Sequence, residues 1–145
     1  RDLRILPWWM PELGWVPAGF GKAARRLLPK CLSVCMENDI DPDTIILTGH
    51  SLGGAVALIV GALMVRDEIV PQQIVTFGAP RCGRLKLLDG IPVTCYRHGK
   101  DIVPLVPPLM RRHKPLEQKG IKASFIRDHY VHNYIEMDKI EEVES

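Results

Sequence analysis

A chain of 145 residues with 46% apolar side chains is long enough to bury a substantial core, and it predicts a single domain over residues 1–145. The formal net charge is only +2, and the one basic cluster, Arg111-Arg112-His113-Lys114, is too short to indicate a nucleic-acid-binding protein. No apolar run reaches the length of a transmembrane helix, so no membrane-spanning segment is expected.

The N-terminal segment, residues 1–19, is rich in tryptophan and is expected to lack regular structure. Trp8, Trp9 and Trp15 are interspersed with residues that interrupt helices and strands, namely Pro7, Pro11, Gly14 and Pro17. A segment of this kind packs as a flap over one edge of a core, or it lines or covers an apolar pocket. The sequence leaves these alternatives open.

A helix is predicted from Ala18 to about Asn38, because apolar side chains recur at steps of three and four residues. The apolar positions are Phe20, Ala24, Leu27, Cys31 and Cys35. Pro29 lies inside this pattern and should kink or divide the helix. A turn cluster at residues 39–43 should end it.

The cysteines are predicted to be free thiols. Cys31, Cys35, Cys82 and Cys95 form neither a C-x-x-C pair nor a spacing suited to zinc. Cys31 and Cys35 share the apolar face of the predicted helix, which favours buried thiols that act as small apolar side chains. This use of cysteine favours a reducing compartment, and therefore a cytoplasmic location.

Residues 49–53, Gly-His-Ser-Leu-Gly, fit the G-x-S-x-G pattern of a nucleophile elbow. The pattern needs a strand before it and a helix after it. Both are predicted, since Thr44–Thr48 is rich in β-branched residues and Ala55–Val65 is apolar on most faces. A serine in such a tight turn has a strained backbone, and Gly49 and Gly53 are expected to lie where a Cβ would not fit. The alternative is a glycine-rich turn in which Ser51 caps the helix.

The elements that follow alternate between strand and helix. Val103–Pro108 is too rich in proline for a central strand. Alternating elements predict an α/β fold with a mostly parallel sheet covered by helices. The remaining predicted elements are strands at Gln73–Phe77, Pro92–Tyr96 and Ile121–Ile126, and a closing helix at His129–Val143.

A serine hydroxyl becomes a nucleophile only when a base takes its proton and an acid orients that base. In an α/β-hydrolase the acid follows the serine in the chain and lies beyond the carboxyl end of a strand. Asp101, five residues beyond Tyr96, fits this position best. Asp89 follows no clear strand and is interpreted as a turn residue. The alternative role for Asp101 is a cap of the turn that follows it.

Five histidines could supply the base. His50 lies inside the elbow, where its side chain should diverge from that of the serine. His98 precedes the candidate acid, and His113 is expected to be solvated in the basic turn. His129 and His132 remain, at the head of the closing helix. His129 is preferred because it follows an aspartate suited to N-cap that helix, but a helix-packing role stays open for both.

The chain resembles the class 3 lipase family of α/β-hydrolases through several motifs that occur in family order. They are Trp15-Val-Pro-Ala-Gly-Phe20, Thr48-Gly-His-Ser-Leu-Gly-Gly-Ala55, Thr76-Phe-Gly-Ala-Pro-Arg-Cys-Gly83, Lys100-Asp-Ile-Val-Pro104, and Asp128-His129 with Tyr134. The resemblance implies Ser51 as nucleophile, Asp101 as acid and His129 as base. The Leu52 backbone N–H is the expected oxyanion donor.

The resemblance also implies that the second oxyanion donor of the family lies just before Arg1, so the domain is expected to lack its N-terminal strands. Residues 1–9 resemble the start of the family's lid, and Pro17 stands where the family often carries a histidine. The expected activity is hydrolysis of a lipid or other apolar ester through an acyl-serine, with no metal or cofactor and with transient contact to a lipid interface. Residues 1–19 and Val103–Met110 are expected to flank the acyl chain. Acyl transfer and a non-catalytic lipase-like binding module are the alternatives.

Overall fold

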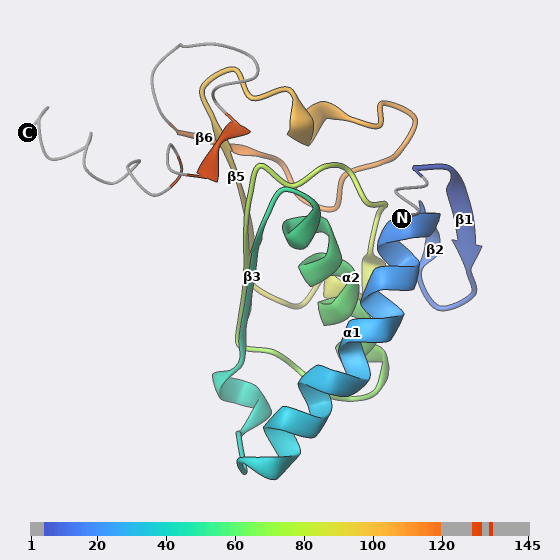
Figure 1. The fold of residues 1–145 in the computed structure, drawn as a ribbon, viewed down its shortest axis with the longest axis vertical. Helices are drawn as coiled ribbons and strands as arrows, with labels where there is room; N and C mark the ends of the chain where they lie inside the picture. The colour runs from blue at the N-terminus through green and yellow to red at the C-terminus, as the bar shows by residue number, and fades with distance from the viewer. Residues whose placement is uncertain (1–4, 120–128, 132–133, 135–145) are drawn as a thin grey trace, which may run out of the picture.

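The computed structural model describes residues 5–119, 129–131 and 134, and a parallel sheet lies at its centre (Figure 1). The strands, in the spatial order β3-β4-β5-β6, are Ile46–His50, Gln73–Phe77, Val93–His98 and Glu117–Lys119. Neighbouring strands are parallel, with His50 beside Phe77 and Phe77 beside Tyr96. Their carboxyl ends therefore meet at one edge of the sheet, which is where open α/β sheets carry their sites.

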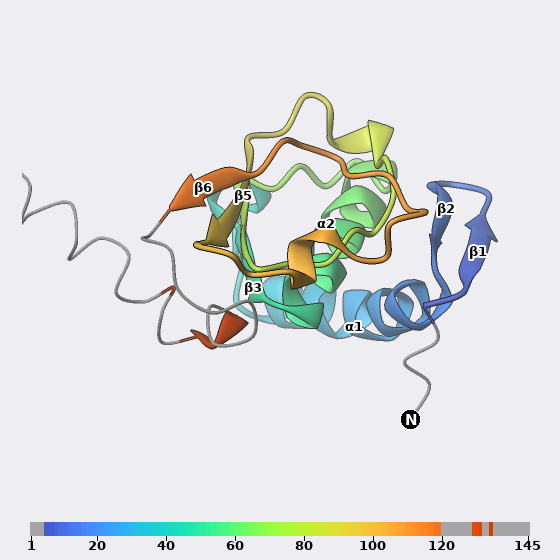
Figure 2. The ribbon, with the colours of Figure 1, turned by 90° about the horizontal axis from the view of Figure 1, so that it is seen from above.

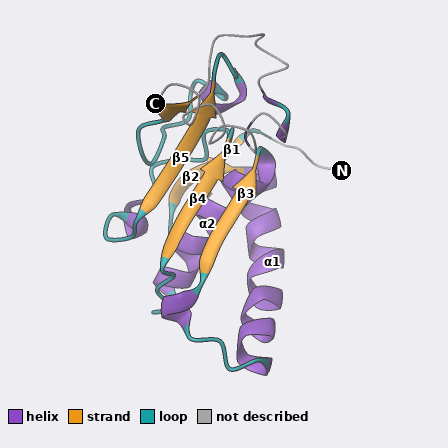
Figure 3. Ribbon diagram, turned by 90° about the vertical axis from the view of Figure 1, so that its left-hand side faces the viewer, coloured by secondary structure: helices purple, strands orange, loops and turns teal. Residues whose placement is uncertain are grey.

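Both helices of the described chain, α1 (Ala18–Glu37) and α2 (Leu52–Arg66), lie on the same face of this sheet (Figure 3). Helix α2 is enclosed by the sheet, α1 and the core, and every residue from Gly54 to Met64 is buried. A helix surrounded in this way needs no polar face, which explains why the sequence after the elbow is apolar throughout.

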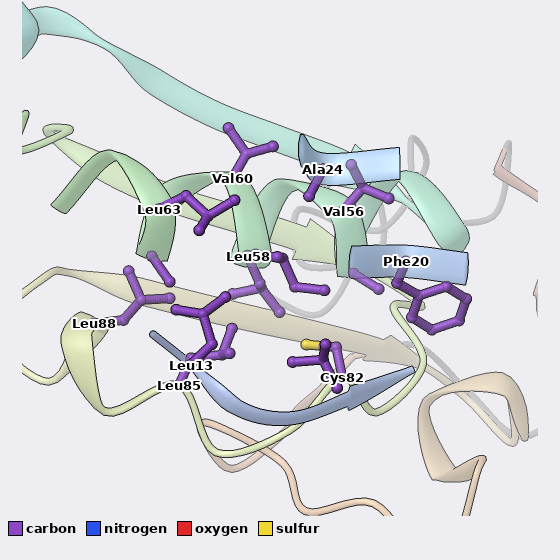
Figure 4. Close-up of a cluster of buried hydrophobic side chains, with 14 of the residues drawn as sticks. Leu13, Phe20, Ala24, Val56, Leu58, Val60, Leu63, Cys82, Leu85 and Leu88 are labelled. Atoms are coloured by element: carbon purple, nitrogen blue, oxygen red, sulfur yellow. The ribbon is translucent and has the colours of Figure 1, made fainter. Parts of the chain in front are cut away.

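Buried apolar side chains of α2 also pack against the N-terminal segment and against the 3₁₀ turn η2 (Lys86–Leu88). Leu58 and Leu63 of α2 face Leu13, Leu85 and Leu88 in this cluster (Figure 4). Full burial of a leucine contributes about 1.5–3 kcal/mol. These contacts therefore fix the N-terminal segment against the helix that follows the elbow.

The N-terminal segment forms a β-hairpin, so the expectation of irregular structure was wrong for Pro7–Pro17. Strand β1 (Pro7–Met10) pairs antiparallel with β2 (Gly14–Pro17), on the opposite side of the molecule from β6 (Figure 2). Pro7 and Pro17 face each other at the open end of the ladder, where their missing N–H groups interrupt nothing. Trp9 lies opposite Trp15, with ring centroids 5.5 Å apart in an edge-to-face contact.

Helix α1 is continuous, so Pro29 does not divide it. Its N-terminal half carries the buried face, whereas its C-terminal half extends beyond the end of α2 (Figure 1). Cys31 and Cys35 lie in this second half and are only half-buried, which corrects the expectation of buried thiols for these two residues. Cys82 and Cys95 are buried, and all four thiols are free, as predicted.

The strand at Gln73–Phe77 has the predicted bounds, and two others are shifted. β3 begins at Ile46 because a 3₁₀ turn, η1 (Pro42–Thr44), precedes it, and β5 runs to His98. Val103–Leu105 forms a further 3₁₀ turn, η3, in agreement with its proline content. The predicted strand at Ile121–Ile126 and most of the predicted closing helix lie outside the described residues.

Within the described part of the chain, no helix combines the length and apolar character needed to span a membrane.

Candidate active site

Ser51 occupies the sharp turn between the last residue of β3 and the first residue of α2. Its backbone has φ 54° and ψ −130°, a conformation that costs a non-glycine residue about 1–3 kcal/mol. The Ser51 N–H donates to the Phe77 carbonyl of the adjacent strand at 2.9 Å, which holds the turn at the carboxyl edge of the sheet. The turn therefore has the conformation that an elbow requires.

Close packing around the elbow excludes a Cβ at Gly49 and Gly54, and not at Gly53. A Cβ on Gly49 would lie 2.4 Å from the Gly53 carbonyl carbon, and one on Gly54 would lie 2.8 Å from both the Gly49 oxygen and the Ala79 Cβ. A Cβ on Gly53 meets nothing within 4 Å. The expectation that both glycines of the five-residue pattern are sterically required was therefore wrong for Gly53, because it lies on the exposed side of the first turn of α2.

The structure brings Ser51, His129 and Asp101 together, although they are far apart in the sequence. His129 Nε2 lies 2.8 Å from Ser51 Oγ, and His129 Nδ1 lies 2.8 Å from Asp101 Oδ2. Asp101 is completely buried, and its other oxygen accepts a hydrogen bond from the Val103 N–H at 2.9 Å. A carboxylate held in this way can fix the Nδ1–H tautomer of the imidazole, which leaves Nε2 free to take the serine proton.

Tyr134 is a further partner of the acid. Its hydroxyl donates to Asp101 Oδ2, the same oxygen that contacts His129. Burial of the phenol, and its bond to Asp101, raise the pKa of Tyr134 well above its usual value, so the hydroxyl stays protonated as a donor. The sequence marked Tyr134 only as part of a family motif, and assigned it no role.

The backbone of Gly78, directly after β4, lies close to the side chains of the acid and the base. Its φ is +60°, and a Cβ there would lie 2.7 Å from the Tyr134 hydroxyl, 2.8 Å from Asp101 Oδ2 and 3.1 Å from His129 Nδ1. Any side chain at this position would displace the groups that hold His129. The sequence places Gly78 directly after the predicted strand Gln73–Phe77, but it does not reveal this close approach.

The other described histidines lie in surroundings that differ from those of His129. His50 Nε2–H donates to the backbone oxygen of His129 at 2.7 Å, and His98 is buried with its ring centroid 5.9 Å from that of Tyr134. His113 was expected to be solvated, but it is only 6% exposed, and the Arg84 guanidinium lies 3.0 Å from its Nδ1. Burial and the neighbouring Arg84 charge lower the pKa of His113. His132 lies outside the described residues.

The predicted oxyanion donor, the Leu52 N–H, belongs to the first turn of α2, where backbone N–H groups have no acceptor within the helix. The positive end of the helix dipole adds to the attraction for a negative oxygen at this point. The geometry therefore allows Leu52 to donate to an oxyanion formed at Ser51.

A groove of about 770 Å³ is lined by the hairpin, by η2 and the residues just before it, and by residues 109–111 beyond η3. Trp9, Trp15 and Leu109 line it and are largely exposed, at 54%, 58% and 90%. The two segments expected to flank an acyl chain thus line the same groove. Among the described residues that line it, however, none belongs to the Ser51–His129–Asp101 cluster.

No group of three or more histidine, cysteine, aspartate or glutamate side chains suited to a metal ion is found among the described residues.

A parallel sheet that carries a serine in a strand-to-helix elbow, followed in the chain by an aspartate and a histidine within hydrogen-bonding distance, defines the α/β-hydrolase class. The family model described as Lipase (class 3) matches residues 10–111. The chain belongs to the class 3 lipase family.

Lipases of known name or solved structure are similar to this chain in sequence and in structure. A lipase of Rhizopus niveus is 42% identical in an alignment 104 residues long that covers 64% of this chain and 26% of that protein. The crystal structure of a lipase from Rhizopus microsporus var. chinensis is 29% identical, with a TM-score of 0.66, over 85% of this chain and 48% of that one. A triacylglycerol lipase described as having a serine protease triad for its catalytic centre is 30% identical, with a TM-score of 0.57, over 74% of this chain and 45% of that one.

The chain therefore spans about a quarter of the length of the curated Rhizopus lipase and about half of the solved lipase structures.

Proposed function

We propose that this chain carries the catalytic centre of a serine carboxylic-ester hydrolase that acts on lipid esters through an acyl-serine intermediate. One observation supports the proposal above all others: His129 lies between Ser51 and Asp101, with both hydrogen-bond distances at 2.8 Å. This order of nucleophile, base and acid matches the roles that acyl transfer requires.

In the proposed acylation step, Ser51 Oγ attacks the carbonyl carbon of the ester while His129 Nε2 takes the hydroxyl proton. The carbonyl oxygen becomes an oxyanion that accepts a hydrogen bond from the Leu52 N–H. Asp101 stabilises the imidazolium of His129. The imidazolium then gives its proton to the leaving alcohol oxygen as the carbon–oxygen bond breaks, and the acyl group stays on Ser51.

Deacylation repeats the same steps with water as the nucleophile. His129 takes a proton from water as the water oxygen attacks the acyl carbon, and it returns that proton to Ser51 Oγ as the carboxylic acid leaves. Every step uses groups within the cluster, and none requires a metal or a cofactor.

A lipid ester is the proposed substrate because the similar proteins of known name are lipases and because the chain exposes an apolar groove. In this proposal, the groove lined by Trp9, Trp15 and Leu109 contacts the apolar part of a lipid assembly. The ester bond itself reacts at Ser51. Lys86 and Arg111 also line this groove and are exposed, and their charges suit an anionic lipid surface.

The proposal is tested with a fluorophosphonate probe and a chromogenic ester, applied to the wild type and to Ser51→Ala. We expect covalent labelling at Ser51 and ester hydrolysis in the wild type, with labelling lost on heating. Ser51→Ala should lose both while its circular dichroism spectrum is retained. Full activity in Ser51→Ala would contradict the proposal, and a folded wild type that is never labelled would support a non-catalytic binding module instead.

A further inference from the structure

His50, the residue before the candidate nucleophile, is tied to the main chain of the candidate base. Its Nε2–H donates to the backbone carbonyl oxygen of His129 at 2.7 Å, across 79 positions of sequence. A carbonyl oxygen can only accept, so Nε2 of His50 must carry a proton. The contact is therefore a directional bond between the strand that bears Ser51 and the backbone that bears His129.

The ring of His50 is also held from two sides. Its centroid lies 4.8 Å from that of His129, with the planes tilted by 31°, and 5.5 Å from that of Tyr134 in an edge-to-face contact. The imidazole thus contacts both the ring of the base and the phenol that binds Asp101. These ring contacts and the hydrogen bond together orient the ring with Nε2 directed at the carbonyl oxygen.

We propose that His50 is a positioning residue, which fixes the main chain of His129 relative to Ser51 and so keeps the base in place throughout the reaction. This inference rests on the proposed hydrolase function. Two hydrogen bonds hold the ring of His129, and one of them, to Ser51 Oγ, breaks when the serine is acylated. The bond from His50 uses the main chain and persists in the acyl-enzyme, so it holds the base for the attack of water as well.

The size of the effect follows from the geometry of proton transfer. Displacement of a catalytic group by about 1 Å lowers the rate about 10²-fold. His50 hydrogen-bonds to the main chain of His129 and not to its ring nitrogens, so its loss should change kcat and leave KM nearly unaltered.

Two substitutions separate the hydrogen bond from the packing. His50→Gln retains an N–H donor near the position of Nε2, whereas His50→Phe retains a planar ring and has no donor. We expect kcat to fall by about 10- to 100-fold in His50→Phe and by less than about fivefold in His50→Gln, with KM within about twofold in both. The matched control is His113→Leu, which replaces a buried histidine outside the site and should leave kcat unchanged.

The rate constant for fluorophosphonate labelling of Ser51, measured with excess probe, gives a second readout. It reports on activation of the nucleophile in folded molecules only, so partial unfolding of a variant changes the amplitude and not the rate constant. We expect the same order, with wild type and His50→Gln faster than His50→Phe. Equal rate constants for His50→Phe and wild type, or equal losses in His50→Phe and His50→Gln, would overturn the inference. A wild type that is neither labelled nor active would instead overturn the proposed function.

Discussion

The two adjacent glycines that follow Ser51 should respond in opposite ways to the same added methyl group. At Gly53 a Cβ meets nothing within 4 Å and the residue is exposed, so Gly53→Ala should add up to about 1 kcal/mol of stability through its better helix propensity. At Gly54 a Cβ would lie 2.8 Å from both Gly49 O and Ala79 Cβ. These are a backbone atom and a short side chain that cannot rotate away, so Gly54→Ala should cost about 1–3 kcal/mol.

The same contacts predict the effect on activity. Relief of the clash at Gly54 requires α2 to move away from β3, and Ser51 lies at the junction of the two. A shift of about 1 Å there should lower kcat about 10²-fold. Gly53→Ala moves neither element, so its kcat should stay within about threefold of wild type.

Urea unfolding followed by circular dichroism gives the stability of each variant, and hydrolysis of a soluble chromogenic ester gives kcat. The two substitutions are identical in chemistry and adjacent in sequence, so each is the control for the other. Equal stabilities in the two variants would refute this reasoning, as would a loss of more than about 1 kcal/mol in Gly53→Ala.

Three further changes have defined outcomes. Asp101→Asn should lower kcat on the order of 10⁴-fold with an unchanged circular dichroism spectrum, because an amide no longer selects the Nδ1–H tautomer of the base; a loss below tenfold would contradict the assigned role. The pKa of His113 lies below its usual 6.5, so as pH falls below 6.5 the unfolded state gains a proton before the native state does and native stability falls. His113→Leu should flatten this dependence in urea titrations between pH 7.5 and about 5.5, and parallel curves for wild type and variant would count against it. Trp9→Ser and Leu109→Ser should each reduce activity on anionic lipid vesicles about five- to tenfold more than activity on a soluble ester, and equal losses on both substrates would argue against lipid contact at the groove.

Helices and strands whose formation depends mainly on residues close together in the sequence could be predicted. The β-branched run Gln73–Phe77 forms a strand with the predicted bounds, and the apolar stretch after Ser51 forms a buried helix. Pro7–Pro17 could not be predicted, because a proline excludes a central strand position but not the end of a two-stranded ladder. Whether a proline lies at a central position or at the end of the ladder depends on where the partner strand ends.

Burial was the property that local sequence determined least well. The basic surroundings of His113 in the sequence suggested a solvated side chain, yet Arg84, from a segment 29 residues away, covers it. Cys31 and Cys35 continue the apolar stripe of α1, but they lie in the part of the helix that extends beyond the core. Burial depends on which elements pack together, and periodicity reports only on one element at a time.

The sequence by itself determined the elbow, the α/β class and the candidates for nucleophile, acid and base, because short-range sterics and the order of elements restrict them. Residue reasoning alone left His129 and His132 open, and it expected the His50 side chain to diverge from that of Ser51. Only the tertiary structure decided that His129 reaches Ser51, that His50 holds the main chain of His129, and that Gly54 rather than Gly53 has no room for a side chain. These contacts join β3, the end of β4 and a segment nearly 80 residues further along the chain. Their distances depend on how segments far apart in the sequence pack together, which no stretch of sequence encodes alone.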